Sequence, residues 1–413
     1  MQNKYGWALA VLLVLLVGGY FGYQYVKYRP PAFLIALFTA AKPPAPLPEG
    51  LAAPLMVPEG FSATIFARDV KGARVLVRDP KGALLVSQTS EGKVSALPDL
   101  NGDGQADRIV EVLSGLDQPH GLAFICVQED SCTLYVAETG ALKAYAYDAD
   151  TYKATYQKTL ATFPTGSGHY TRTLLPAPDN KSLFVSVGSS CNACEESSPL
   201  RASVQSVNLE TGVMTPVATG LRNTVFMALH PVTGELWGTE NGRDLIGDDI
   251  PPDELNIIKQ GGNYGWPICY GQKVHDTDYD KRQYIRDPCA DTVAAHVDLP
   301  AHSAALGLAF VPEEGWPEEY WHDALVAYHG SWNRSEPAGY KVVRIDFLNP
   351  EGTLRQDQFT TDFVTGFLPA GGKSASDTIG RPVAVLAEPG GVAYVSDDRA
   401  GAVYKISLNE PPR

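Results

Sequence analysis

The sequence predicts an all-β fold, a six-bladed β-propeller, and three observations support this prediction. From Gly60 onward helical periodicity is weak, and short runs of β-branched and aromatic residues end at Pro, Asp or Gly turns. Six of these runs share one order: a polar or Arg residue, an apolar strand, a turn and a second apolar strand. The second strands are expected to begin near residues 84, 134, 183, 235, 324 and 393, so the first three intervals are about fifty residues, the length of a propeller blade.

This repeat favours a propeller over a β-sandwich, the alternative fold for many short strands. A single blade cannot bury both of its faces, and radial stacking gives each blade two neighbours and protects its edges. The fourth interval is stretched by an acidic segment, 239–271, and the fifth by HGSWNRSEPAGY, 329–340. Loops where the inner strands start are expected to build a functional site at one mouth of the central channel.

The N-terminal part predicts a membrane anchor. Residues 1–29 are assigned to the anchor or signal segment, 30–58 to a proline-rich linker and 59–409 to the propeller domain. Trp7–Val26 contains twenty residues without a charge, enough to cross a bilayer as a transmembrane helix. No small-residue cleavage pattern directly follows, which favours an uncleaved anchor over a removed signal peptide. The paired cysteines favour an outside position for the large domain, so the expected location is the bacterial inner membrane with the propeller in the periplasm. Secretion after cleavage is the alternative.

The six cysteines form three pairs that are close in sequence: Cys126 with Cys132, Cys191 with Cys194, and Cys269 with Cys289. Three local disulfides would suit an exported domain. A zinc site at the Cys191–Cys194 pair is the rival interpretation, but no second CxxC or HxxxH completes a tetrahedral set.

The charge balance excludes one class of partner. The chain has a net charge of −14, whereas a surface that binds phosphate backbones needs a basic face. Nucleic acid is therefore not an expected partner.

Residues just before or after the predicted strands are the candidates for chemistry. Several are cationic, and their convergence on one channel would call for an anionic ligand. The alternative for each Arg is a structural ion pair with a carboxylate. His169 lies in GSGHYTR beside these cations, which makes a general base possible. The candidates are Gln118, His120, His169, Arg172, Arg222, Asn223, Arg334 and Arg381.

Two segments carry the hard oxygen ligands that Ca²⁺ prefers. The first segment, 99–107, has oxygen ligands at alternate positions and resembles the front half of a calcium loop. It lacks the Glu that completes an EF-hand loop, because Val110 stands at that position, and a simple Asx-rich turn is the alternative. Its candidate ligands are Asp99, Asn101, Asp103 and Asp107. The second segment lies within 239–271 and carries Glu240, Asp244, Asp248, Asp249, Asp253 and Glu254.

Four segments carry a family resemblance. They are GLRNTVFMALHPVTGELWGTENGRD (220–244), DELNIIKQGGNYGWP (253–267), HGSWNR (329–334) and GRPVAVLAEPGGVAYVSDD (380–398). Over about residues 60 to 410 the chain resembles the soluble pyrroloquinoline-quinone-dependent sugar dehydrogenases, and within them the sorbosone dehydrogenases. The resemblance implies a six-bladed propeller with pyrroloquinoline quinone (PQQ) over the channel mouth.

The resemblance also implies roles for single residues. His169 matches the family's base, which takes the proton of the sugar hydroxyl while hydride passes to the quinone C5. Arg222 and Asn223 match the pair that polarises the quinone oxygen, and Arg381 matches an Arg that binds a cofactor carboxylate. The family's bridging Ca²⁺ takes main-chain carbonyls at positions that match Gly242 and Arg243. Glu254 and Tyr264 match positions used by further calcium ions.

The chain departs from the family pattern at three places. A second Arg expected two residues after Arg381 is Val383, and Arg334 is the substitute for a cofactor-binding Lys. A cofactor-binding Gln aligns near Gln118 and His120. The expected function is PQQ- and calcium-dependent oxidation of an aldose or sorbosone-type sugar, with electrons leaving to an external acceptor such as a membrane quinone or cytochrome. The alternatives are a non-catalytic binding propeller and a calcium-dependent lactonase.

Overall fold

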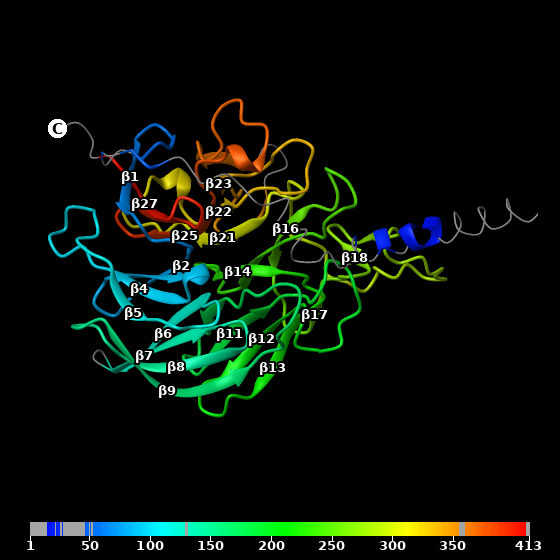
Figure 1. The fold of residues 1–413 in the computed structure, drawn as a ribbon, viewed down its shortest axis with the longest axis horizontal. Helices are drawn as coiled ribbons and strands as arrows, with labels where there is room; N and C mark the ends of the chain where they lie inside the picture. Colours follow the sequence, from blue (N-terminus) through cyan, green and yellow to red (C-terminus); the bar gives the residue numbers. More distant parts are fainter. Residues whose placement is uncertain are drawn as a thin grey trace, which may run out of the picture.

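The computed structural model describes residues 15–20, 22–24, 27, 46–48, 50, 53–128, 131–354 and 360–409. Within this part of the chain, six antiparallel sheets lie around a common axis, which confirms the predicted six-bladed propeller (Figure 1). The innermost strands of successive blades contact each other in a closed ring, in the order β2, β6, β10, β14, β21, β25 and back to β2.

Each blade contains four strands in sequence order, with two departures: blade four takes β20 after an insertion as its outermost strand, and blade six takes its outermost strand from the N-terminal side. Blade one is β2 (Ala73–Arg78), β3 (Leu84–Gln88), β4 (Lys93–Leu97) and β5 (Val110–Leu113). Blade two is β6 (Gly121–Gln128), β7 (Ser131–Ala137), β8 (Ala141–Asp148) and β9 (Lys153–Thr162). Blade three is β10 (Leu174–Pro176), β11 (Ser182–Val187), β12 (Ser203–Asn208) and β13 (Met214–Thr219).

The second half of the ring follows the same plan. Blade four is β14 (Thr224–Leu229), β15 (Leu236–Glu240), β16 (Asp253–Ile257) and β20 (Val297–Leu299). Blade five is β21 (Ala305–Phe310), β22 (Ala324–Tyr328), β23 (Lys341–Ile345) and β24 (Thr360–Val364). Blade six is β25 (Pro382–Glu388), β26 (Val392–Asp397), β27 (Ala402–Leu408) and β1 (Phe61–Ala67). The part of the chain that the structure describes also contains three short 3₁₀ helices, η1 (Thr89–Glu91), η2 (Glu318–Tyr320) and η3 (Ala375–Asp377).

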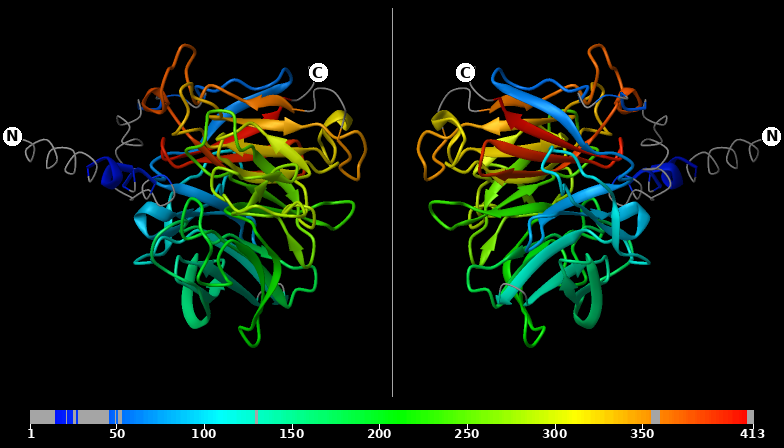
Figure 2. Two further views of the ribbon diagram at one scale, coloured as in Figure 1. Left: turned by 90° about the vertical axis from the view of Figure 1, so that its right-hand side faces the viewer. Right: turned by 90° about the vertical axis from the view of Figure 1, so that its left-hand side faces the viewer.

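The last blade closes the ring by joining the two ends of the domain. Strand β1 pairs antiparallel with β27, with Phe61 opposite Leu408. Figure 2 shows from two sides that the blue N-terminal strand lies beside the red C-terminal strands. This pairing removes the free edge that an open ring of blades would leave.

Inner strands carry a β-bulge close to the channel mouth. The register shifts at the start of β2, β14, β21 and β25. In blades one, three, four and six, a main-chain N–H near the start of the inner strand donates to a hydroxyl on the second strand, and in blades one, four and six this N–H lies within the bulge. The donor and acceptor pairs are Val75 with Ser87, Thr173 with Ser186, Phe226 with Thr239, and Ala384 with Ser396.

Blade four contains the long insertion that stretched the repeat. Between β16 and β20 the chain adds β17 (Gly262–Asn263) as a parallel edge strand on blade three, then the hairpin β18 (Cys269–Tyr270) and β19 (Val274–His275). The Cys269–Cys289 disulfide ties this insertion together. All three predicted disulfides are present, which excludes the zinc interpretation of Cys191 and Cys194.

The predicted membrane span, Trp7–Val26, lies largely outside the described residues. Of it, residues 15–20 and 22–24 are helical. Among the described residues, no helix has the length and apolarity that a bilayer crossing requires. The assignment of residues 1–29 as an anchor therefore stays a prediction, as does the linker over 30–58.

Candidate functional site

A cavity of about 350 Å³ opens at the channel mouth where the inner strands begin. Its walls come from blades one, three, four, five and six, as expected for a site built from the loops of a propeller. The polar residues that line it include Arg74, His169, Arg222, Asn223, Asn241, Asp244, Asp253, His302, His329, Asn333 and Arg381. The structure therefore brings His169, Arg222, Asn223 and Arg381 together, as the sequence predicted.

The ring of His169 is held through Nδ1. This nitrogen lies 3.0 Å from Ser189 Oγ and 3.2 Å from the Ser189 carbonyl oxygen. Ser189 Oγ donates its only hydrogen to the Cys191 carbonyl at 2.6 Å, so both Ser189 oxygens are acceptors toward the ring. Nδ1 must then carry the ring hydrogen, which leaves Nε2 with a free lone pair. Desolvation, followed by the positive charge of Arg222, lowers the pKa of His169 well below its ordinary value and keeps the ring neutral.

Arg222 is buried in the same part of the wall as His169 and uses all of its donors. Nε donates to the Asn192 carbonyl at 3.0 Å, and NH1 donates to the carbonyls of Asn241 and Gly242 at 3.2 and 2.8 Å. NH2 donates to Asn192 Oδ1 and to Asp244 Oδ2, both at 2.9 Å. Arg222 therefore places a fixed positive charge in the wall, and an incoming oxygen would have to replace one of these acceptors.

Asn223 leaves a polar atom for a ligand. Its Nδ2 donates to Asn241 Oδ1 at 3.3 Å, but its Oδ1 is buried and has no partner among the described residues. A buried acceptor without a donor is costly, so this oxygen indicates a missing hydrogen-bond donor or cation. Gly188 permits the close approach, because a Cβ there would lie 2.6 Å from His169 Cβ and 2.7 Å from Asn223 Oδ1.

Blades one, five and six form a cationic wall. Arg381 donates to the carbonyls of His329 and Gly330 at 3.0 and 2.6 Å, and it has no ion pair with a described carboxylate. Arg74 pairs with Asp398 at 2.7 Å, and the other oxygen of Asp398 lies 2.9 Å from His329 Nε2. Desolvation and the nearby Arg381 lower the pKa of His329 to about 4. Only Arg74 forms an ion pair with Asp398, so the guanidinium of Arg381 is not neutralised by a paired carboxylate, and the wall keeps a net positive charge that suits an anionic ligand.

Three predicted ligand residues do not line this cavity. Gln118 is exposed, and its Oε1 accepts a hydrogen bond from Thr139. His120 is fully buried, with Nδ1 3.2 Å from Thr173 Oγ1. Arg334 lies in a neighbouring depression with Asp249, because that carboxylate at 3.1 Å and the carbonyls of residues 248 and 301 hold it there.

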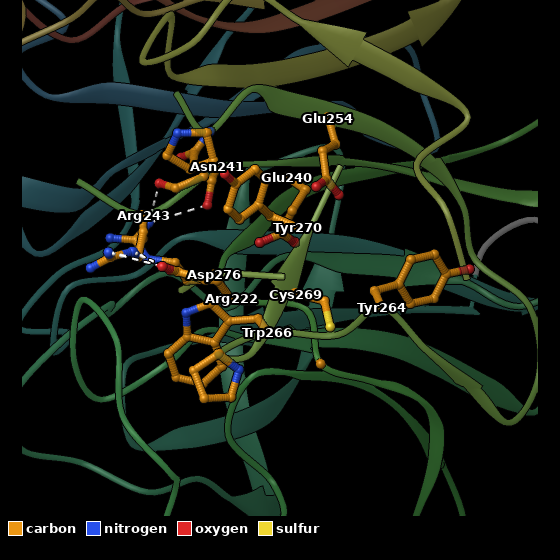
Figure 3. Close-up of a pocket in the computed structure, with 14 residues that line it drawn as sticks. Arg222, Glu240, Asn241, Arg243, Glu254, Tyr264, Trp266, Cys269, Tyr270 and Asp276 are labelled. Carbon is orange, nitrogen blue, oxygen red and sulfur yellow. Dashed lines mark hydrogen bonds and ion pairs between the residues drawn. The ribbon is translucent and has the colours of Figure 1, made fainter. Parts of the chain in front are cut away.

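Next to Arg222, a second, smaller cavity is lined by buried carboxylates (Figure 3). Its volume is about 20 Å³, room for one water molecule or one ion. Glu240 and Glu254 are register partners on β15 and β16, and Glu254 is also opposite Asp298 on β20. Three carboxylates therefore lie in a row across three strands, an arrangement that is unfavourable unless a proton or a cation neutralises it.

Burial and this mutual repulsion raise the pKa values of the two glutamates. Desolvation is the largest cause in both, with Glu254 acting on Glu240 and Asp298 acting on Glu254. The pKa of Glu240 rises to about 8 and that of Glu254 to about 7. Hydrogen bonds from the main chain of Asn223 and from Thr224 occupy Glu240, and Asn256 and Gly271 donate to Glu254. Carboxylate oxygens are the ligands that a hard divalent cation such as Ca²⁺ prefers, although among the described residues the carboxylates of this row do not gather into a cluster of three.

The other predicted calcium residues adjoin this cavity. The Gly242 carbonyl accepts a hydrogen bond from Arg222, which leaves it one lone pair, and a Cβ at Gly242 would lie 2.5 Å from the Pro252 carbonyl. The side chain of Arg243 pairs with Asp276 and Asp278. The hydroxyl of Tyr264 donates to the Ile257 carbonyl and accepts from Lys259 N–H, so only the Tyr264 carbonyl is available as a ligand.

The loop containing Asp99, Asn101, Asp103 and Asp107 forms a network of turns. Asp99 accepts hydrogen bonds from the main-chain N–H groups of Gly102, Asp103 and Gly104. Among the described residues, the carboxylates of this loop do not gather closely enough to form a cluster of ligands. Calcium binding there stays a prediction, and the Asx-rich turn accounts for the contacts seen.

The comparison with family models decides the classification. The model described as TrAA12-like matches residues 55–409, nearly the whole propeller. The chain belongs to the TrAA12-like family.

Two curated relatives of the chain are described as dehydrogenases that depend on pyrroloquinoline quinone. The chain is 25% identical over 392 residues to a pyrroloquinoline quinone-dependent pyranose dehydrogenase of Coprinopsis cinerea, covering 79% of this chain and 51% of that one. It is 29% identical over 181 residues to a pyrroloquinoline quinone-dependent sugar dehydrogenase of Hypocrea jecorina, covering 37% and 41%. The chain thus spans about half the length of the curated relatives it matches.

Solved structures show the shared fold. The calcium structure of the Trichoderma reesei Carbohydrate-Active Enzymes Family AA12 protein has a TM-score of 0.73 at 22% identity, covering 87% of this chain and 98% of that one. The holo form of the pyranose dehydrogenase PQQ domain from Coprinopsis cinerea has a TM-score of 0.72 at 22% identity, covering 88% and 98%.

Some residues of the site were missed by the sequence analysis. Arg74 could have been found from the repeat. Arg74, Arg172 and Val383 each directly precede the residue whose main-chain N–H donates to a hydroxyl on the second strand, so they hold equivalent positions in blades one, three and six. Alignment of the repeats at this position would have found it. No sequence signal pointed to Asn192 or Asp298, because their roles depend on contacts with residues that are distant in sequence.

The acidic cavity leads to a prediction about pH. We expect the metal-free protein to lose thermal stability as pH rises from about 5 to about 8, and Ca²⁺ to restore a shift on the order of 5 °C in Tm at pH 8. Both glutamates have higher pKa values in the folded than in the unfolded chain, so their stabilising contribution is lost as pH rises through the folded values of about 7 and 8.

Thermal unfolding from pH 5 to 8, with chelator and with Ca²⁺, checks this expectation. The Glu240→Gln/Glu254→Gln variant is the matched comparison, since it cannot release these protons. Its metal-free Tm should change less with pH than that of the wild type, whereas equal slopes would contradict the assignment.

Proposed function

We propose that this protein oxidises a sugar, an aldose or a sorbosone-type sugar, with PQQ as hydride acceptor and Ca²⁺ as its metal. The observation that carries the proposal is a single cavity that joins a neutral His169, a buried Arg222 and a cationic wall with surplus positive charge. The named activities of the relatives, pyranose and sugar oxidation with PQQ, support the same function.

The cationic wall fits the cofactor, which carries three carboxylates. Arg381 has no ion pair with a described carboxylate, and Arg74 shares Asp398 with His329. Val383 occupies the place in blade six that Arg74 holds in the neighbouring blade one. Arg74 would therefore supply the second guanidinium that the family pattern expects at residue 383.

The wall that contains His169 and Arg222, on blades three and four, fits the quinone end of the cofactor, where the reaction takes place. When bound, the quinone would accept a hydride from the sugar carbon and Ca²⁺ would polarise the quinone carbonyl. His169 would take the proton of the sugar hydroxyl at Nε2, because Nδ1 already carries a hydrogen held by Ser189. The fixed charge of Arg222 would stabilise negative charge that develops beside it.

The acidic cavity would hold calcium close to the cofactor. Glu240, Glu254 and the Gly242 carbonyl lie around it, next to the Arg222 wall. Once Ca²⁺ is bound, the two carboxyl groups would be ionised and their repulsion offset. Electrons would then leave to an external acceptor, and membrane anchoring by residues 1–29 would place that acceptor in the membrane.

A cofactor titration of the purified protein tests the proposal. PQQ is added with and without Ca²⁺, and the quinone absorbance is followed as aldoses and sorbosone are supplied. We expect Ca²⁺-dependent binding and bleaching by at least one sugar. Binding without bleaching would favour a binding propeller, and lactone hydrolysis without PQQ would favour a lactonase; either result would overturn the proposal.

A further inference from the structure

A short loop closed by a disulfide contacts both reactive groups of the cavity. This bridged loop, residues 189–194, runs from Ser189 to the Cys191–Cys194 disulfide and contains Asn192. It lies between β11 and β12 and contains no helix or strand, so no ladder of main-chain hydrogen bonds fixes it. Both half-cystines are nevertheless buried, with 5% and 6% exposed surface.

Asn192 connects Arg222 to Asp244. Its Oδ1 accepts hydrogen bonds from Arg222 NH2 at 2.9 Å and from the Asp244 N–H at 2.7 Å. Its Nδ2 donates to the Asp244 carbonyl at 2.9 Å, and its own carbonyl accepts from Arg222 Nε at 3.0 Å. One buried side chain thus sets the plane of the guanidinium and its distance from the carboxylate.

Ser189 acts on the other reactive group. Its Oγ donates to the Cys191 carbonyl, inside the bridged loop, and this fixed direction leaves only lone pairs for His169 Nδ1. If the loop opened, the hydroxyl could rotate and donate to the ring, and the Nδ1–H form would lose part of its preference. The Ser189 N–H also donates to the Arg222 carbonyl at 2.7 Å, which links the two halves of the wall.

We propose that the bridged loop is a positioning element that sets the tautomer of His169 and the orientation of Arg222. Ser189 and Asn192 make the contacts, and the disulfide restricts the loop that carries them. The inference rests on the proposed function for its effect on turnover, but the tautomer of His169 is a property of the protein alone. None of the residues of the bridged loop needs to touch the substrate.

The test is the Cys191→Ser/Cys194→Ser variant of the full chain, compared with Cys126→Ser/Cys132→Ser. The control removes a disulfide from the hairpin of β6 and β7, at the end of blade two opposite the mouth. The ¹⁵N chemical shifts of the His169 ring, identified by their loss in His169→Gln, report the tautomer without cofactor or sugar. Steady-state kinetics and the pH profile of kcat report turnover.

We expect the wild type and the control to show the Nδ1–H form. The Cys191→Ser/Cys194→Ser variant should show shifts that move toward a mixture of tautomers, and a kcat that falls roughly 10- to 100-fold with KM changed far less. Wild-type ¹⁵N shifts and kcat in this variant would overturn the inference. If the variant does not fold, Asn192→Ala and Ser189→Ala replace it, and Ser189→Thr should restore the shifts that Ser189→Ala alters.

The two proposals can fail separately. A wild type that oxidises no sugar would remove the proposed function, while the ¹⁵N measurement would still decide whether the bridged loop sets the tautomer. Normal turnover with unchanged shifts in the disulfide variant would remove this inference and leave the proposed function intact.

Discussion

Replacement of His169 by alanine is expected to lower kcat for sugar oxidation by ~10²- to 10⁴-fold, the usual contribution of a positioned general base. Nε2 is the free nitrogen of a neutral ring, because Ser189 holds Nδ1–H and the cavity lowers the pKa of the imidazole. Cofactor affinity should change little, since the cationic wall lies on other blades.

The measurement is kcat with an artificial electron acceptor, together with a titration of PQQ by absorbance. His322→Ala is the matched control, because this His precedes β22 and lies at the end of blade five opposite the mouth, where it pairs with Glu313 at 2.9 Å. Full activity in His169→Ala would exclude the base role. Loss of PQQ binding would instead mean that His169 holds the cofactor.

Replacement of Arg222 by glutamine should lower kcat about 10²- to 10³-fold, in the range seen when a preorganised electrostatic group is removed. The fixed charge is lost, and Asp244 and the carbonyls of Asn241 and Gly242 lose their donors. We also expect a lower Tm, because breaking a buried ion pair leaves one partner uncompensated.

Arg344→Gln separates the loss of charge from the loss of stability. Arg344 pairs with the buried Asp323 on blade five, away from the cavity, so this variant should lower Tm but keep kcat at a permissive temperature. If both variants lose the same activity, the effect of Arg222 is one of folding. A normal kcat in Arg222→Gln would remove it from the reaction.

The positions of the blades were predictable from the sequence because the repeat is local. Second strands begin at residues 84, 131, 182, 236, 324 and 392, each within three residues of the expected start. The alternation of apolar residues and the turn residues that end each strand are signals that extend over only a few positions. Each strand can therefore be recognised from its own residues and those of the adjacent turn. The disulfides were predictable for the same reason, since each partner is close in sequence.

The site was predictable only in part. Arg222 and Arg381 were found because each lies beside a predicted strand end in a segment that resembles the family, and His169 because its loop opens a blade beside the cationic residues and its position matches the family's base. Arg334 was assigned to the cofactor as a substitute for the family's cofactor-binding Lys, but Asp249 and two carbonyls hold it in another depression. His120 was placed among the ligands, but it is buried next to Thr173.

The sequence by itself determined the six-bladed repeat, the paired cysteines and the residues at the strand ends, because these depend on neighbours along the chain. Only the tertiary structure decided which of these residues share a cavity. The row Glu240, Glu254 and Asp298 arises from the register of three strands, and Asn192 meets Arg222 only when blade three packs on blade four. Such contacts join positions tens of residues apart, and their pKa values and hydrogen bonds depend on burial that packing alone creates.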